Sequence, residues 1–253
     1  MHYSDVLIVG SGPAGCSAAI FCAQNNLKVT LLDTEEISKP KPGESLHPGI
    51  IPLFKQLGFL DQFLSANFLQ YDGNWVKWEN STHFQAFGED NLEKWHGFQV
   101  YRPYFDEILL EHERKLGVKI IRSCKALSPI YLDKKRISGI LTSKGKLLSS
   151  FVIDSSGGSH WLARKTGLCI QNYSPILIGH YGYVKGKCPS RDNAPLISAE
   201  NDGWIWTAKI KPQIYQWVRL FFQQPHNLKT SSLVPTEYKG LEEISCHRGS
   251  NET

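Results

Sequence analysis

Apolar residues in the first thirty positions recur in the pattern of a strand, a helix and a second strand. Residues 6–9 form a short apolar run of the kind that is buried on both faces of a parallel sheet. Residues 16–24 are rich in alanine and predict a helix, and residues 28–32 are again apolar and lead into Asp33. This order predicts the start of an open α/β sheet.

The pattern further along the chain predicts a second long helix and several antiparallel strands. The helix is expected at about 104–116, with Pro103 in its first turn and Gly117 at its end. A Pro-, Gly- and Lys-rich loop at 38–48 precedes short helical turns at 50–57 and 60–64. Strands are expected at 118–121, 125–132, 136–142 and 146–153, and an aromatic-rich stretch with rough strand alternation covers 69–100.

A glycine-rich turn joins the first strand to the first helix. Residues 10–15 read Gly-Ser-Gly-Pro-Ala-Gly, which is G-x-G-x-x-G, and Asp33 follows 18 positions after Gly15. In this context Gly10 allows the tight turn, Gly12 admits a pyrophosphate close to the backbone, and Gly15 lets the helix pack on the strand. The helix N-terminus attracts phosphate, and Asp33 is suited to a ribose. The motif alone does not separate FAD from NAD.

Composition and charge narrow the class of protein. The 253 residues hold 28 Lys and Arg against 24 Asp and Glu, a net charge of +4, which gives no argument for a nucleic-acid partner. The one basic run, 134–136, is expected at a hairpin tip. Six scattered cysteines without a C-x-x-C pair predict neither disulfides nor a metal site. With no apolar run long enough to span a membrane, we expect a soluble cytoplasmic protein without a membrane partner.

Four motifs in order along the chain carry a family resemblance: G-S-G-P-A-G at 10–15, G-E-S-L at 43–46, Y-R-P-Y-F-D at 101–106 and V-I-D-S-S-G at 152–157. Over residues 4–222 the chain resembles the flavoprotein superfamily of p-hydroxybenzoate hydroxylase, and particularly its tryptophan-halogenase-like branch. The resemblance implies FAD as cofactor. It also implies a Rossmann-like FAD/NAD(P)-binding three-layer α/β fold with a β-meander crossover and an inserted antiparallel substrate-binding sheet.

The resemblance assigns roles to the matching positions. The ADP half of FAD would be held by the glycine loop and the acid after the second strand, namely Gly10, Gly12, Pro13, Ala14, Gly15 and Asp33. The isoalloxazine or ribityl side would be lined by Gly43, Glu44 and Ser45. Arg102 would contact the phosphates or ribityl chain, and Asp154 and Gly157 would close the site. Simpler roles compete: a solvated loop acid for Glu44, a surface cap for Arg102 and a turn residue for Asp154.

The resemblance also suggests a division of the chain. A discontinuous FAD-binding domain would comprise 1–68 and 99–175, and a substrate-binding sheet 69–98 and 176–222. Residues 223–253 are polar and predict a linker or frayed end. A third FAD motif, a strand ending in Gly-Asp, does not occur after residue 222. We therefore expect a shortened chain, which the coding sequence downstream would test.

The leading functional hypothesis is a flavin monooxygenase that acts on a small aromatic substrate through a flavin C4a-hydroperoxide. NAD(P)H or a separate flavin reductase would supply electrons. Two alternatives stay open within the fold: a halogenase or prenyl-type reductase, and a non-catalytic nucleotide-binding remnant. The histidines at 47, 83, 96, 160 and 180 have no identifiable partner, so surface or structural roles are expected for them.

Two features bear on the halogenase alternative. Tryptophan halogenases carry W-x-W-x-I-P, and Trp204-Ile205-Trp206 matches its first half, but Ala208-Lys209 replaces Ile-Pro. The same tryptophans, with Tyr215 and Trp217, would equally suit one buried face of a sheet. Lys77, 34 positions after Gly43, is a weak candidate for the catalytic lysine of that family, and Glu44 is a second weak catalytic candidate. A solvated strand lysine is the preferred interpretation of Lys77.

Overall fold

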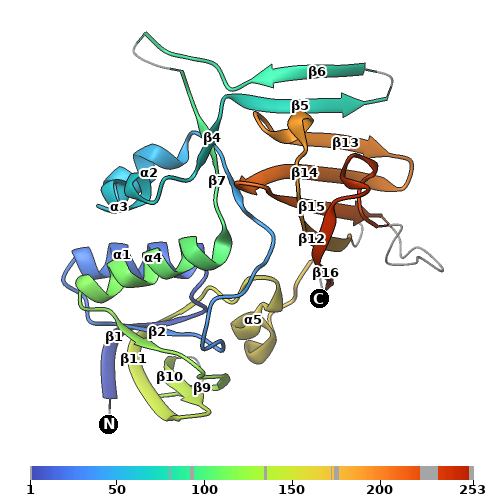
Figure 1. Ribbon diagram of the computed structural model, residues 1–253. Coiled ribbons are helices and arrows are strands. Elements are labelled where there is room, and N and C mark those ends of the chain that lie inside the picture. Colours follow the sequence, from blue (N-terminus) through green and yellow to red (C-terminus); the bar gives the residue numbers. More distant parts are fainter. Residues whose placement is uncertain are drawn as a thin grey trace.

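In the computed structural model the chain forms a six-stranded sheet and a seven-stranded sheet, and a small three-stranded sheet lies between them (Figure 1). It describes residues 2–79, 81–91, 94–133, 136–171, 173, 177–222 and 233–250. The hairpin tip expected at 134–136 falls largely outside the described residues. No helix of the described segments is long and apolar enough to cross a membrane.

The six-stranded sheet has the order β8-β2-β1-β11-β10-β9. Its parallel part consists of β1 (His2–Val9), β2 (Val29–Leu32), β8 (Lys119–Ile121) and β11 (Gly145–Asp154). The antiparallel strands β10 (Ile137–Thr142) and β9 (Ala126–Tyr131) extend it as a meander. Every residue of β2 is buried, as expected for a strand covered on both faces.

Helices cover one face of this sheet, and on the other face side chains of β1 and β2 pack with side chains of the meander strands. Figure 1 shows α1 (Pro13–Gln24) and α4 (Arg102–Lys115) side by side over the strands. Ile8 and Leu31 pack toward Ile20 and Leu109 in one buried cluster. On the opposite face Leu7 and Leu32 pack with Ala126 and Ile140, which belong to the meander. The expected three-layer α/β fold with a β-meander crossover is confirmed.

The seven-stranded sheet has the order β16-β12-β15-β14-β13-β5-β6 and is antiparallel except between β13 and β5. Its strands are β5 (Gly73–Trp78), β6 (Ser81–Ala86), β12 (Ile178–Lys185), β13 (Leu196–Glu200), β14 (Gly203–Lys211), β15 (Ile214–Phe221) and β16 (Glu242–Ser250). The segments expected to form the substrate sheet thus supply all of these strands but β16.

The four aromatic residues expected on one face of this sheet divide between its two faces. Thr207 pairs with Trp217, so these two residues share a face, and Trp217 is fully buried there beside Tyr215. Trp206 pairs with Val218 and therefore projects to the other face with Trp204. The expectation was wrong because spacing within each strand does not determine the register between strands.

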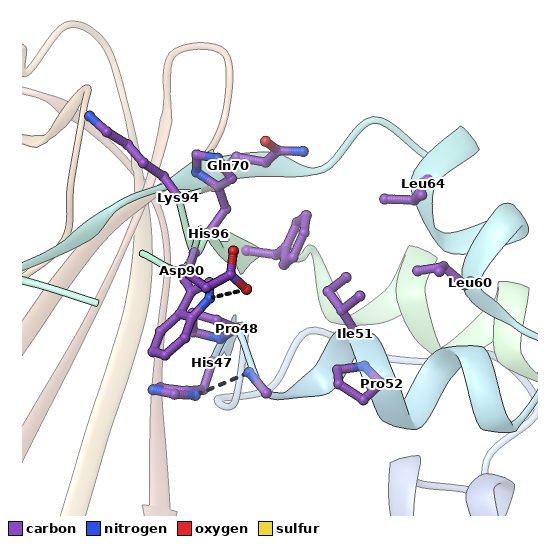
Figure 2. Close-up of a pocket in the computed structure, with 13 residues that line it drawn as sticks. His47, Pro48, Ile51, Pro52, Leu60, Leu64, Gln70, Asp90, Lys94 and His96 are labelled. Atoms are coloured by element: carbon purple, nitrogen blue, oxygen red, sulfur yellow. Dashed lines mark hydrogen bonds between the residues drawn. The ribbon is translucent and has the colours of Figure 1, made fainter. Parts of the chain in front are cut away.

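A three-stranded sheet lies between the two large ones and contacts β14. It contains β3 (Ser45–Leu46), β7 (Gly97–Gln99) and β4 (Leu69–Tyr71). Residues 69–71 and 97–98 were expected in the substrate-binding sheet, but they belong to this three-stranded sheet instead. Two short helices, α2 (Ile50–Gln56) and α3 (Leu60–Ser65), pack beside it. They form one wall of a cavity whose other wall includes Asp90, Lys94, Trp95 and His96 (Figure 2).

The C-terminal segment expected to be a linker or frayed end is structured over residues 233–250. Strand β16 pairs along the whole of β12, and Leu233 and Tyr238 are buried against Trp217. The expectation failed because an edge strand keeps a polar face toward solvent and shows little hydrophobic alternation. Residues 223–232 and 251–253 lie outside the described part of the chain.

Candidate functional site

The glycine loop leaves the N-terminus of α1 open to a ligand. A Cβ on Gly10 would overlap the carbonyl of Ser155, whereas nothing lies within 4 Å of a Cβ placed on Gly12. Pro13 has no N–H, and the first helical hydrogen bond runs from the Cys16 amide to the Gly12 carbonyl at 2.9 Å. The amides at the start of α1 therefore have no acceptor within the helix and face an uncrowded backbone, which suits a phosphate.

The loop after β11 meets the glycine loop at the carboxyl ends of two parallel strands. Val9 is in register with Asp154, and the Ser155 amide donates to the Val9 carbonyl at 2.8 Å. Gly157 has a φ of +64°, and nothing lies within 4 Å of a Cβ placed on it. Ligands of open α/β sheets bind in crevices at this end of the strands.

Asp154 shapes its own loop. One carboxylate oxygen accepts the Ser156 amide at 3.0 Å and the other accepts the Leu162 amide at 2.8 Å. These bonds fix the turn that leads into α5 (Trp161–Thr166). The structure thus gives Asp154 the turn role considered for it, and it places Gly157 on the resulting loop.

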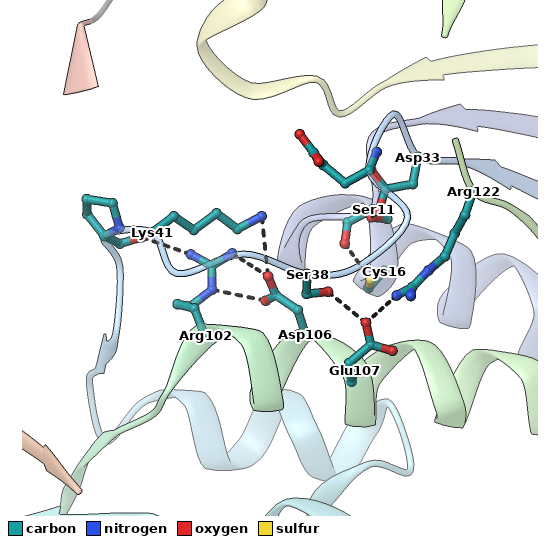
Figure 3. Close-up of polar contacts among 11 residues, drawn as sticks. Ser11, Cys16, Asp33, Ser38, Lys41, Arg102, Asp106, Glu107 and Arg122 are labelled. Carbon is teal, nitrogen blue, oxygen red and sulfur yellow. Dashed lines mark hydrogen bonds and ion pairs between the residues drawn. The ribbon is translucent and has the colours of Figure 1, made fainter. Parts of the chain in front are cut away.

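Asp33 lies at the end of β2 beside the glycine loop (Figure 3). Its Oδ2 accepts the hydroxyl of Ser11, and its Oδ1 accepts the Glu35 amide at 3.0 Å. A carboxylate offers about four lone-pair positions, so acceptor capacity remains for a ligand hydroxyl. The structure therefore brings Asp33 next to Gly10–Gly15, as the sequence motif predicts.

Arg102 forms a buried fork with Asp106 and fastens the loop at 41–43 (Figure 3). Its Nε and Nη2 donate to the two Asp106 oxygens at 3.0 and 3.1 Å, and its Nη1 donates to the Pro42 carbonyl at 3.0 Å. Lys41 also contacts Asp106, at 3.3 Å. Because Arg102 is 8% exposed, the surface-cap alternative is wrong. It sets the position of Gly43, whose φ is +98°.

A second ion pair, which sequence reasoning missed, fastens the preceding part of the same loop. Glu107 of α4 accepts hydrogen bonds from Ser38, at 2.9 Å, and from Arg122. Arg122 also donates to the Glu36 carbonyl at 2.7 Å. Partial burial raises the pKa of Glu107, but the bonds from Arg122 and Ser38 outweigh it and hold the pKa below its ordinary value.

Glu44 is buried, with 1% of its surface exposed, so the solvated-acid alternative is wrong. The Tyr183 hydroxyl donates to its Oε1 at 3.0 Å, and its Oε2 has no hydrogen-bond partner among the described residues. Burial raises the pKa of Glu44 to about 8, against the lowering effects of Tyr183, Arg102 and Lys211. Its neighbour Ser45 donates to the Gln99 side chain at 2.9 Å.

Lys77 lies away from this group of residues. Its side chain is exposed on β5, where it pairs with Ser198 of β13 and Thr82 of β6. Figure 1 shows β5 near the edge of the seven-stranded sheet that is remote from α1. The structure thus supports the preferred interpretation of Lys77 as a solvated strand lysine.

The cavity in Figure 2 has a volume of about 830 Å³. Its apolar wall comes from α2, α3 and Phe98, and its polar wall from His47, Asp90 and residues 94–96. In the polar wall the Trp95 indole N–H donates to Asp90 at 3.4 Å, and His96 Nδ1 lies 2.7 Å from Asp72. Sequence reasoning missed this cavity because its walls come from segments that no local pattern connects.

Comparison with known proteins adds three findings. Residues 3–190 match the family model described as FAD binding domain. A flavin-dependent halogenase of Armillaria mellea is 29% identical over 231 residues, 81% of this chain and 43% of the relative. A tryptophan 2-halogenase of Chondromyces crocatus is 28% identical over 258 residues, 94% of this chain and 48% of the relative. The chain therefore spans about half the length of these relatives.

The fold has a matching solved structure. The myxobacterial chondrochloren halogenase superposes with a TM-score of 0.85, at 19% identity, over 99% of this chain and 64% of that protein. At this identity the match concerns the fold alone, and it includes both large sheets because nearly the whole chain is covered.

Proposed function

This chain belongs to the family of proteins with an FAD binding domain, in its tryptophan-halogenase-like branch, and we propose that it provides the flavin site of a flavin-dependent halogenase. The curated relatives favour halogenation over the aromatic hydroxylation that led the sequence-based hypotheses. The activity, the substrate and a flavin reductase as electron source are parts of the proposal.

The geometry of the glycine loop fits the ADP half of FAD. The amides of Ala14 and Gly15 would bind the pyrophosphate over the open Gly12 backbone, and Asp33 would accept the ribose hydroxyls. Gly10 would allow the tight turn of the glycine loop, and Gly157 would leave space for the cofactor on the loop after β11. When bound and reduced, FAD would supply, with O₂, the oxidising equivalent that halide oxidation requires.

The flavin end of the cofactor would lie along the loop that Arg102 fastens. Gly43, Glu44 and Ser45 follow this loop directly and lead into β3. Arg102 uses three of its five guanidinium N–H donors for bonds to the described residues, so two remain for a ligand. Its principal role in the proposal is to hold Gly43 against α4.

The cavity beside α2 and α3 is proposed as the substrate site. Its volume of about 830 Å³ falls in the ordinary range for small-molecule pockets. Apolar side chains on one wall and the exposed Trp95 on the other favour a flat aromatic substrate. His47 lines the cavity and follows Leu46 directly in the sequence, so the cavity is next along the chain to the segment proposed to hold the flavin end.

The open N-terminus of α1 over Gly12 carries the FAD part of this proposal, and Gly12→Ala tests it. Gly12 has a φ of −71°, which alanine adopts freely, and its Cβ would meet nothing in the protein. We expect the free energy of unfolding to change by less than about 1 kcal/mol. The added methyl group would instead obstruct the pyrophosphate, and we expect FAD affinity, followed by flavin fluorescence, to fall at least about tenfold.

Two results would contradict the proposal. Equal FAD affinity in Gly12→Ala and the parent protein would show that the glycine loop does not bind the pyrophosphate of FAD. A parent protein that binds no FAD would support the non-catalytic alternative.

A further inference from the structure

A buried polar cluster joins the Gly43 loop to the seven-stranded sheet. Glu44 contributes its carboxyl from the loop and Tyr183 its phenol from β12, and these side chains are 1% and 4% exposed. The Glu44 carbonyl also accepts the Val100 amide at 2.6 Å, which fixes the backbone beside β7. The carboxyl is therefore held from both sides at the junction of the sheets.

No ion pair among the described residues neutralises Glu44. At the start of α4, the Arg102 guanidinium directs Nε and Nη2 to Asp106, whereas the Arg102 backbone amide acts on the Glu44 carboxyl and lowers its pKa. Tyr101, just before the helix, presents its ring nearby. On β14, the Lys211 ammonium sits 3.6 Å from the centre of the Tyr101 ring. On β12, Tyr181 and Tyr183 face the carboxyl. Burial therefore prevails over these neighbours and keeps the carboxyl protonated at neutral pH.

The location of the proton follows from the hydrogen bonds. Oε1 already accepts from the Tyr183 hydroxyl, so the neutral acid carries its proton on Oε2. Oε2 is buried and has no partner among the described residues. A buried O–H without an acceptor is unfavourable, and an acceptor on a ligand would satisfy it.

We propose that Glu44 binds FAD as a neutral carboxylic acid, donating from Oε2 to an acceptor atom at the flavin end, and that Tyr183 is the residue that positions it. This inference rests on the proposed flavin site. It adds to that site a residue of the seven-stranded sheet, so that both sheets take part in holding the cofactor. It also links FAD binding to a proton, because an ionised Glu44 would have no donor and would add negative charge beside an anionic ligand.

The test is the dissociation constant of oxidised FAD across roughly pH 6 to 9, followed by flavin fluorescence. In the parent protein we expect a constant value below about pH 7.5 and about tenfold weaker binding near pH 9, because Glu44 ionises with a pKa of about 8. Glu44→Gln keeps a donor and an acceptor but cannot ionise. It should retain affinity at neutral pH and lose the pH dependence.

Two tyrosine variants separate positioning from general structure. Tyr183→Phe removes a bond that lowers the pKa of Glu44, so the weakening should begin at higher pH. Tyr181→Phe is the matched control, because this neighbour on the same strand donates no hydrogen bond to Glu44, and its curve should match the parent.

The outcomes discriminate between this inference and the proposed function. A flat parent curve, or a Glu44→Gln curve that weakens as the parent does, would overturn the role of Glu44 and leave FAD binding and halogenation standing. A pH-linked curve without halogenation would support Glu44 and contradict the proposed reaction. A parent that binds no FAD at any pH would overturn both.

Discussion

The carbonyl oxygen of Gly10 occupies the space where a Cβ on Gly15 would have to be. Gly15 lies in the first turn of α1, so this contact presses the helix start against the end of β1. We expect Gly15→Ala to shift the backbone of the loop and to lower the free energy of unfolding by about 2–3 kcal/mol. Urea unfolding measures the change, and a loss below about 1 kcal/mol, comparable to that of Gly12→Ala, would show that the contact relaxes easily.

Asp33 supplies a test of ribose binding that leaves the fold intact. Asp33→Asn keeps the shape of the side chain and an acceptor for the Glu35 amide but loses the charge. Because a hydrogen bond to a charged group contributes about 1.5–3 kcal/mol, we expect FAD affinity to fall about tenfold to a hundredfold. Asp5→Asn is the control, since Asp5 accepts the Lys28 amide at 2.7 Å away from the glycine loop. Equal losses of FAD affinity in both variants would show that Asp33 has no specific role in binding the ribose.

Glu113 of α4 makes stability depend on pH. It is fully buried, and burial raises its pKa to about 7 against the lowering effects of the Cys16 thiol and Arg114. The folded protein thus holds a proton that the unfolded chain releases above its ordinary pKa of 4.5. The contribution of the neutral acid is complete below about pH 4.5 and is lost as the pH rises toward 7.

The variant Glu113→Gln isolates this effect from other titrating groups. Relative to the parent protein, it should gain about 3 kcal/mol of unfolding free energy between about pH 4.5 and pH 8, because it cannot ionise. Chemical unfolding of both proteins at several pH values gives this difference. A difference that stays constant with pH would show that Glu113 does not titrate in this range.

Because the cavity beside α2 is proposed as the substrate site, filling it should lower kcat/KM without changing the affinity for FAD. Leu64 lines the cavity from α3, and Leu64→Trp would fill part of it. For an aromatic substrate we expect kcat/KM to fall at least about tenfold, with the dissociation constant of FAD unchanged. Leu132→Trp places the same side chain at an exposed position outside the cavity and should change neither quantity. Unchanged turnover in Leu64→Trp would exclude the cavity as the substrate site.

Local steric requirements explain why the glycine loop could be predicted from the sequence. Gly10, Gly15 and Asp33 lie within one strand–helix–strand unit, and each residue type meets a need that its neighbours in sequence define. The meander was predictable for the same reason, because its strands follow one another along the chain.

Features that depend on distant pairing could not be predicted. The partner of Glu44 lies 139 positions away, so neither its burial nor its raised pKa has a local signal. The face occupied by Trp206 depends on strand register, and β16 is recognisable only by its pairing with β12. Such contacts arise from tertiary packing, and hydrophobic periodicity within one segment carries no information about them.

Halogenation by this protein is tested most directly by the mass spectrum of the product formed when the FAD-bound protein is incubated with reduced flavin, O₂, bromide and an indole. We expect a monobrominated indole with the paired bromine isotope signals, and a lower yield from Gly12→Ala because that variant binds FAD more weakly. A product that is hydroxylated without bromine, or no product while FAD is bound, would contradict the assignment of this chain to halogenation.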